Sequence, residues 1–178
     1  MTADPAFAGE RALLPALEDE LQQGERVFWA GKPDLFSLIR TQKLLLLTGG
    51  ALLAWATTAL LMHWISGTTY MPLALVGIAF LAGPLLNLSE HGSTIYAITN
   101  RGALILHRGM RPAVVRTPFG EMDATFEVLE TGYGAGHVYF ASGKPTRLRD
   151  VDYTGKLAFR NVLHAQHVAR VLDAMRKR

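Results

Sequence analysis

The chain has 178 residues, a formal net charge of +3 and no cysteine, which excludes disulfides, thiolate metal sites and a cysteine nucleophile. The charge is unevenly divided: residues 1–43 carry five basic and seven acidic side chains, whereas residues 90–178 carry 13 basic and eight acidic ones. This basic excess suits an anionic membrane surface, but it is too modest and dispersed to indicate nucleic acid as a partner.

Residues 1–42 are expected to form a cytoplasmic arm in front of a membrane segment. Four leucines recur there at helical spacing, opposite three consecutive acidic residues, which predicts a short amphipathic helix over about residues 12–22. These leucines are Leu13, Leu14, Leu17 and Leu21. The acidic face disfavours anionic lipid, so we expect the helix to dock on a protein surface. Docking on the basic C-terminal region is one hypothesis, which the sequence leaves open. A strand-like pentad follows over residues 26–30.

Residues 43–89 are predicted to form a transmembrane helical hairpin, because residues 44–89 contain no Asp, Glu, Lys or Arg. The two spans cover about residues 44–64 and 70–88, with a polar turn between them. A helix over residues 44–62 is about 28 Å long, close to the hydrocarbon thickness of a bilayer. Two consecutive spans of this length disfavour the alternative, a buried hairpin of a soluble protein. The N-terminal residues are polar, so we expect the first span to act as the insertion signal.

The basic residues predict the orientation of this hairpin. The turn between the spans has no Lys or Arg, whereas Arg40 and Lys43 precede the first span and several arginines follow the second. The positive-inside rule then places both termini in the cytoplasm. With no Asp, Glu, Lys or Arg in either span, a transport pathway within one copy has little to work with.

Small residues recur at four-residue spacing within both spans. They are Gly50, Ala54 and Thr58 in the first span, and Ala79 and Gly83 in the second. Small side chains let helices approach closely in lipid. We expect these residues to form the contact seam within the hairpin, although they could equally face a second copy of the chain.

After the second span the hydrophobic period changes from helical to two, which is typical of strands. Strands are predicted over residues 93–99, 103–107, 113–117, 124–129, 137–141 and 156–162, and a final helix over residues 164–176. Six or seven short strands followed by one amphipathic helix predict a small curled antiparallel sheet plugged by that helix over residues 90–178.

Several segments of the chain, in this order, resemble the bacterial pleckstrin-homology-like (PH-like) membrane proteins. In these proteins a strand ending in a Thr-Asn-Arg turn opens the domain, as Thr99-Asn100-Arg101 does here. The similar segments are residues 24–33, 96–105, 117–122, 136–140, 159–162 and 166–172. The resemblance covers about residues 20–176. It implies a bent seven-stranded antiparallel sheet capped by a C-terminal helix, a location in the bacterial inner membrane, and a binding platform rather than a defined activity.

Four arginines near the first turns of the expected sheet domain are candidates for binding lipid or a partner. They are Arg101, Arg108, Arg111 and Arg116. The turn at Arg101 is too short to cradle a headgroup as the long first loop of eukaryotic pleckstrin-homology domains does. General attraction to anionic lipid, at about 1 kcal/mol per basic residue near the surface, is the remaining interpretation beside a solvated basic face.

Other chemistry-bearing residues give weaker signals. Gly132, Gly134 and Gly136 have no helix directly after them to bind phosphate, so they predict a hairpin turn. His164 and His167 could face one metal, but no further ligand stands at motif spacing, so we expect no metal. Asp150 and Asp152 are expected to pair with Arg147 or Arg149 rather than to act in acid–base catalysis.

These observations together predict an α+β membrane protein with a two-helix transmembrane hairpin followed by a PH-like sheet domain. We expect a multi-pass, inner-membrane binding or scaffolding module that faces the cytoplasm, without cofactor or catalytic activity. Its expected partners are membrane lipids and either a protein partner or a second copy of the chain, but not nucleic acid. Two alternatives stay open: a sensor of anionic lipid headgroups, and an accessory subunit of a transporter or channel.

Overall fold

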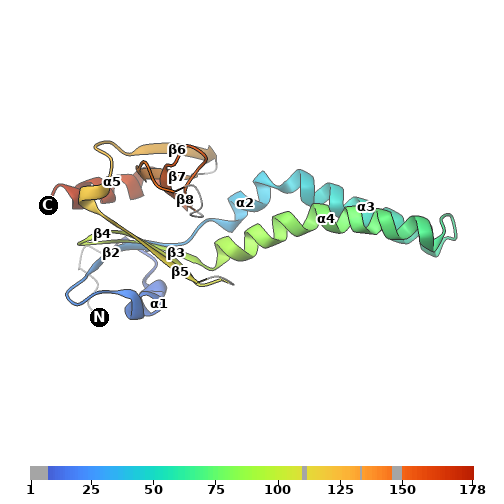
Figure 1. The fold of residues 1–178 in the computed structure, drawn as a ribbon, viewed down its shortest axis with the longest axis horizontal. Helices are drawn as coiled ribbons and strands as arrows, with labels where there is room; N and C mark the ends of the chain where they lie inside the picture. Colours follow the sequence, from blue (N-terminus) through green and yellow to red (C-terminus); the bar gives the residue numbers. More distant parts are fainter. Residues whose placement is uncertain (1–7, 110–111, 133, 146–149) are drawn as a thin grey trace. The chain divides into compact units, whose positions relative to one another are not determined.

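The structure is a computed structural model that describes residues 8–109, 112–132, 134–145 and 150–178 (Figure 1). It divides into two compact units: residues 38–89, and residues 1–37 together with 90–178. We call the first the hairpin and the second the sheet unit. The sheet unit thus contains chain from both sides of the hairpin. The arm expected over residues 1–42 and the domain expected over residues 90–178 are therefore largely one folded unit.

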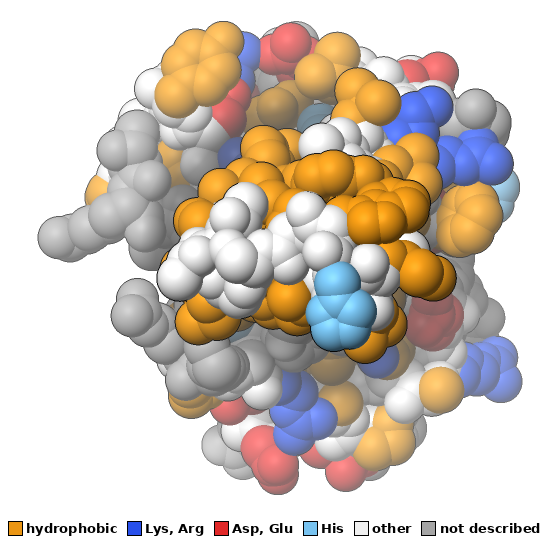
Figure 2. All heavy atoms as spheres, turned by 90° about the vertical axis from the view of Figure 1, so that its right-hand side faces the viewer, with side chains coloured by type: hydrophobic (Ala, Val, Ile, Leu, Met, Phe, Trp, Pro, Cys, Tyr) orange, Lys and Arg blue, Asp and Glu red, His pale blue; other side chains and the backbone are white. Residues whose placement is uncertain are grey.

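The hairpin consists of two long apolar helices, α3 (Lys43–Leu61) and α4 (Gly67–Gly92), preceded by the short helix α2 (Leu35–Thr41). Both α3 and α4 are long and apolar enough to cross a membrane, and only 17% of the most apolar window of each is buried. Core helices of a soluble protein would bury most of such a surface. Figure 2 looks onto the end of the hairpin, where hydrophobic side chains surround a polar tip.

The first sheet of the sheet unit has five strands in the order β1-β2-β3-β4-β5. The strands are β1 (Ala8–Gly9), β2 (Val27–Gly31), β3 (Thr94–Thr99), β4 (Gly102–His107) and β5 (Ala113–Pro118). Strand β2, from before the hairpin, pairs antiparallel with β3, the first strand after it. This pairing makes the expected arm part of the sheet. The short β1 pairs parallel to β2.

A helical segment covers the outer face of this sheet. It consists of the 3₁₀ turn η1 (Arg11–Leu13), α1 (Leu14–Leu17) and the 3₁₀ turn η2 (Glu18–Glu20) instead of one continuous helix. Pro15, which has no N–H to donate, lies in the first turn of α1 and begins a new segment there. Leu13 and Leu17 pack on Val27, Leu104 and other residues of the sheet, so this segment docks on the C-terminal region, a question that the sequence left open.

Strand β3 is buried on both faces as a result. Ile95 and Ala97 face the N-terminal helical segment, whereas Tyr96 and Ile98 face the main core. All six residues of β3 are buried, including the polar residues of the alternation from which the strand was predicted. Such an alternation is typical of a strand with one face in solvent, but here the N-terminal helical segment covers that face.

The second sheet has three antiparallel strands in the order β6-β7-β8, followed by the last helix. These elements are β6 (Glu127–Gly132), β7 (Ala135–Ala141), β8 (Leu157–Leu163) and α5 (Ala165–Arg176). A 3₁₀ turn, η3 (Phe119–Glu121), leads from the first sheet toward β6. Beyond β2, the backbone N–H of Asp34 donates to the carbonyl of Asn161 in β8 at 2.6 Å, which joins the two sheets.

The main core lies between the two sheets and α5. Phe159 is its centre, with ring centroids 4.8 Å from Phe140, 5.0 Å from Tyr96 and 5.8 Å from Trp29. These aromatic rings come from both sheets, and their packing stabilises the contact between the sheets. Helix α5 adds Val168, Leu172 and Met175, and the exposed face of α5 stays outside the core.

Candidate functional site

Two of the four predicted arginines meet in one groove, and the other two do not join them. Arg101 and Arg116 line a groove beside the turn between β3 and β4. Arg108 follows the far end of β4, and a six-residue strand is about 20 Å long. Arg111 lies outside the described residues. The four arginines therefore do not form a single binding site in the part of the chain that is described.

Arg116 is held by a buried carboxylate. Its guanidinium lies 3.1 Å from Glu25, whose side chain is 3% exposed. Glu25 also accepts hydrogen bonds from the Thr99 hydroxyl and the Gln22 N–H, both at 2.8 Å. Arg116 further donates to the carbonyl of Glu20. The positive charge of Arg116 thus balances the negative charge of Glu25 in the same chain.

The Thr-Asn-Arg turn holds the segment that precedes the hairpin. Asn100 accepts a hydrogen bond from the Arg26 N–H at 2.9 Å and donates one to the Gly24 carbonyl at 3.3 Å. The Arg101 guanidinium donates to the carbonyl of Gln23 at 2.9 Å. We call these contacts the turn clamp. They give the turn a structural role within the sheet unit.

A buried polar network, which the sequence analysis missed, lies at the other end of β3 and β4. The Thr94 hydroxyl is 3.0 Å from His107 Nδ1, and His107 Nε2 is 2.8 Å from the Asp150 carboxylate. The Tyr96 hydroxyl donates to the same carboxylate at 3.1 Å. Burial, and next the charge of Asp150, raise the pKa of Tyr96 well above its ordinary value. The predicted hairpin brings Thr94 opposite His107, but nothing in the spacing indicated that Asp150 joins them.

The order hydroxyl, imidazole and carboxylate is also that of a hydrolase triad, but here it is inaccessible. Thr94 is 2% exposed, His107 3% and Asp150 4%. A nucleophile must reach its substrate, so this arrangement is better suited to stability than to catalysis. The predicted partners of Asp150, Arg147 and Arg149, lie outside the described residues.

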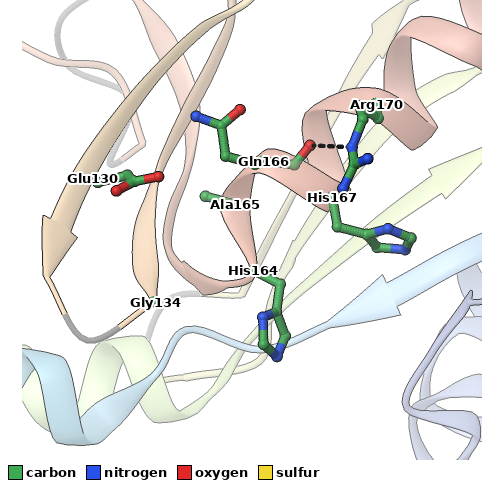
Figure 3. A pocket seen from close by; sticks show the side chains of 7 residues that line it. All are labelled: Glu130, Gly134, His164, Ala165, Gln166, His167 and Arg170. Atoms are coloured by element: carbon green, nitrogen blue, oxygen red, sulfur yellow. Dashed lines mark hydrogen bonds between the residues drawn. The ribbon is translucent and has the colours of Figure 1, made fainter.

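The two histidines at the start of α5 line a shared groove but do not converge. His164 and His167 both border it, together with Glu130 and Arg170. Figure 3 shows the two imidazole rings pointing in different directions. Within the described ranges, no group of three or more side chains of the metal-binding types is close enough to hold an ion.

The glycines lie in the hairpin between β6 and β7, as predicted, and no helix follows them directly, but the turn adjoins the start of α5 in space. The carbonyl of Gly134 accepts the backbone N–H of His164 at 2.7 Å, at the N-terminus of α5. The helix comes from a distant part of the chain, which is why local sequence did not reveal it. The Gly134 carbonyl thus accepts the His164 N–H, a donor that a bound phosphate would need.

A third groove runs between β6 and α5, and we call it the β6–α5 groove. Phe126 and Val128 line it on the strand side, and small side chains, Ala169 and Ala174, line it on the helix side. The charged residues of the lining are three basic ones and one acidic one: Arg170, Arg176, Lys177 and Asp173. Local sequence gave no sign of this groove, because its two walls are far apart in the chain.

Within the hairpin, the contact seam differs from the predicted one. A Cβ atom at Gly49 would meet the Gly77 carbonyl at 2.9 Å, and one at Gly77 would meet Leu53 at 2.7 Å. The buried small residues are Gly49, Ala56, Ala59, Ala74 and Gly77. The predicted residues, which are half-buried or exposed, are Gly50, Ala54, Thr58, Ala79 and Gly83. Both helices carry more than one stripe of small residues, and spacing alone does not tell which one faces the partner helix.

Comparisons of the chain with family models, with curated proteins and with solved structures found no match. The resemblance to PH-like membrane proteins therefore rests on the sequence segments themselves. The function has to be argued from the surfaces of the sheet unit and from the hairpin.

Proposed function

We propose that this protein is a membrane-anchored binding module. In this proposal α3 and α4 cross the bacterial inner membrane, and the sheet unit stands at its cytoplasmic face, where it holds a protein partner. The exposed apolar surface of both helices and their length support the membrane location. The absence of Lys and Arg from residues 62–69, against Arg40 and Lys43 before the first span, supports the orientation.

The observation that carries the proposal is the pairing of β2 with β3 across the hairpin. A strand from before the hairpin and a strand from after it can pair only if both lie on the same side of the membrane. An even number of crossings meets this condition, and two apolar helices supply two crossings. The pairing therefore supports a hairpin whose two ends return to one folded unit.

The arrangement of the sheet unit is also what a PH-like module would need. Strands β2 to β5 and β6 to β8 make seven strands in two sheets, and α5 closes the core between them. One strand of the seven comes from before the hairpin, which matches the similarity of residues 24–33 to the same family. Such folds serve as binding platforms, so we propose binding instead of catalysis. The inaccessibility of the Thr94–His107–Asp150 network agrees with this choice.

Attraction to anionic lipid is the second candidate, and one position favours it. Arg108 is exposed, and its backbone N–H donates to the carbonyl of Ser93, close after the apolar span. In the proposed topology this places Arg108 near the headgroups. Arg101 and Arg116 are bonded within the sheet unit, so they contribute less to such attraction.

Cysteine labelling tests the topology without background, since the chain has no cysteine. We expect Ser66→Cys, in the turn between the helices, to react with a membrane-impermeant maleimide in intact spheroplasts. We expect Tyr153→Cys, on a side chain that is 94% exposed, to react only after lysis. Equal labelling of both variants before lysis would refute the two-span topology.

Native nanodisc extraction of the full chain tests the binding role. A stoichiometric protein that co-purifies from the host membrane supports the module, and a larger polytopic partner would point to an accessory subunit. Enrichment of anionic lipid alone, reduced by salt and by Arg108→Ala, would favour lipid sensing. Recovery of the chain without protein or enriched lipid would contradict both candidates.

A further inference from the structure

Strand β6 forms the free edge of the second sheet. Among the described residues it pairs only with β7. Five of its six residues are exposed, whereas Val128 is half-buried and packs against the core. An edge strand presents backbone N–H and C=O groups that can be satisfied by water or by another strand. The outer edge of β6 is therefore a place where an extended chain can add.

The β6–α5 groove gives such a chain a place for its side chains. Phe126 and Val128 provide apolar contact next to the edge strand, and Ala169 and Ala174 leave room on the helix side. Peptides that add to a sheet edge place alternate side chains toward the sheet's neighbour, so a groove beside the edge can select them. Apolar side chains of moderate size fit between these small and aromatic walls.

The charge of the groove is positive. Arg170, Arg176 and Lys177 face one acidic residue, Asp173. Asp173 is already bonded to Lys177 at 2.5 Å and to Arg176 at 2.9 Å, and the hydrogen bond from Lys177 lowers the pKa of its carboxyl. The carboxylate therefore stays charged and is internally paired. The rest of the lining favours acidic side chains in whatever binds there.

One of the two acidic residues of β6 is already paired within the chain. The carboxylate of Glu127, at the start of β6, pairs with Lys156 at 2.5 Å. The Arg176 guanidinium lies 4.7 Å from the centre of the Phe126 ring, so its charge is placed over the groove's apolar wall. An acidic side chain that follows an apolar one would meet both features at once.

We propose that the β6–α5 groove binds an extended acidic segment of a partner protein, which adds to β6 as a further strand. This inference rests on the proposed binding function and names its site and the chemistry of its partner. A second copy of the chain is the competing occupant, and the particle mass in the test below distinguishes it.

The test uses the full chain in nanodiscs of phosphatidylcholine, which carries no net charge. A displayed library of random peptides of about ten residues, longer than a typical strand of about five or six, is selected on these particles against empty nanodiscs. We expect the enriched peptides to be acidic with alternating apolar residues. An enriched peptide is then resynthesised with N-methyl groups on alternate residues, which removes its N–H donors along one edge. If it adds as a strand, one of the two N-methylation registers loses binding.

Two variants of α5 test whether the peptide binds in the β6–α5 groove. Ala174→Glu adds bulk and negative charge at an exposed position of the groove, and we expect it to weaken binding by about tenfold or more. His167→Glu adds the same side chain at an exposed position of the same helix that does not line the groove, and it should leave binding nearly unchanged. Particle mass is measured alongside for both variants.

Each contrary result overturns the inference. These results are the enrichment of no peptide or of basic peptides, equal effects of the two variants, and full binding in both N-methylation registers. A dimer that Ala174→Glu converts to a monomer, without peptide binding, would show that a second copy covers the groove. The labelling and co-purification experiments do not depend on the groove. If those experiments give the expected results but no acidic peptide is selected, only the proposed peptide binding in the groove is refuted.

Discussion

The guanidinium of Arg116 in β5 and the carboxylate of Glu25 before β2, 3.1 Å apart, join two segments that the hairpin separates in the chain. Glu25 is the buried member of the pair and also accepts a hydrogen bond from Thr99, the residue before the turn clamp. The pair therefore supports the β2–β3 contact that carries the proposed topology. Its loss should weaken the sheet unit more than the loss of an exposed arginine.

We expect Arg116→Ala to destabilise the sheet unit by about 1–3 kcal/mol, because it leaves the Glu25 carboxylate buried with fewer partners. Arg108→Ala, at an exposed arginine outside the groove, should change stability by no more than about 0.5 kcal/mol. Trp29 is the only tryptophan outside the hairpin. Unfolding is therefore followed by Trp29 fluorescence in a Trp55→Phe/Trp64→Phe background. Equal effects of the two arginine variants would contradict the structural role of Arg116.

Asp150→Ala should lower the stability of the sheet unit by at least about 2 kcal/mol. The substitution leaves the Tyr96 hydroxyl and His107 Nε2 buried without their shared partner, and each such group costs about 1–3 kcal/mol. This corresponds to a fall in melting temperature of roughly 5–10 °C. Asp150→Asn, which keeps an acceptor for Tyr96, should cost less. A larger loss in Asp150→Asn than in Asp150→Ala would argue against the network.

The stability of the sheet unit should fall as the pH drops below 6.5, in part because of His137. Burial, and next the charge of Arg160, lower the pKa of His137 from 6.5, and its Nδ1 accepts the Asn161 N–H at 3.1 Å. The unfolded chain takes up this proton at a higher pH than the folded chain does. The contribution of His137 is therefore complete above pH 6.5 and is lost as the pH falls through its lowered pKa. His137→Gln should flatten the melting temperature across this window, and an unchanged slope would refute the assignment.

Gly77→Leu should separate the two helices of the hairpin, since a side chain at Gly77 would clash with Leu53 and the Gly49 carbonyl. Gly83→Leu is the matched control, because nothing lies within 4 Å of a Cβ at that position. Spin labels on Leu47→Cys and Leu86→Cys report the distance between the helices in nanodiscs. We expect a longer and broader distance distribution for Gly77→Leu only. A shift in both variants would mean that Gly83 also lies in the contact.

Local signals were enough to predict the elements that form between neighbours in sequence. The strands expected over residues 93–99 and 103–107 are present as β3 and β4, and the short turn between them is where it was expected. The last helix was expected over residues 164–176 and begins one residue later, at Ala165. The apolar stretches likewise predicted the two long helices, because length and composition determine such elements without reference to the rest of the fold.

Contacts between distant segments were beyond such signals. The sequence indicated that residues 26–30 are strand-like, but not that β2 pairs with β3 across the hairpin. The arginines were recognised as clustered in sequence. Glu25, which forms an ion pair with Arg116, gave no sign of being buried. The β6–α5 groove and the His107–Asp150 contact each combine side chains that no periodicity relates. Tertiary packing determines these contacts, so they cannot be predicted from local sequence patterns.

In the proposed topology, the β2–β3 pairing would also make the folding of the sheet unit depend on correct insertion of the hairpin. During synthesis β2 emerges first, and its partner β3 exists only after both apolar helices have been made. If the second helix failed to return across the bilayer, β2 and β3 would lie on opposite sides of the membrane. Neither the first sheet nor the core around Phe159 could then close. A folded sheet unit would thus certify a correctly inserted hairpin, and a misinserted chain would expose an unpaired β2 to proteolysis.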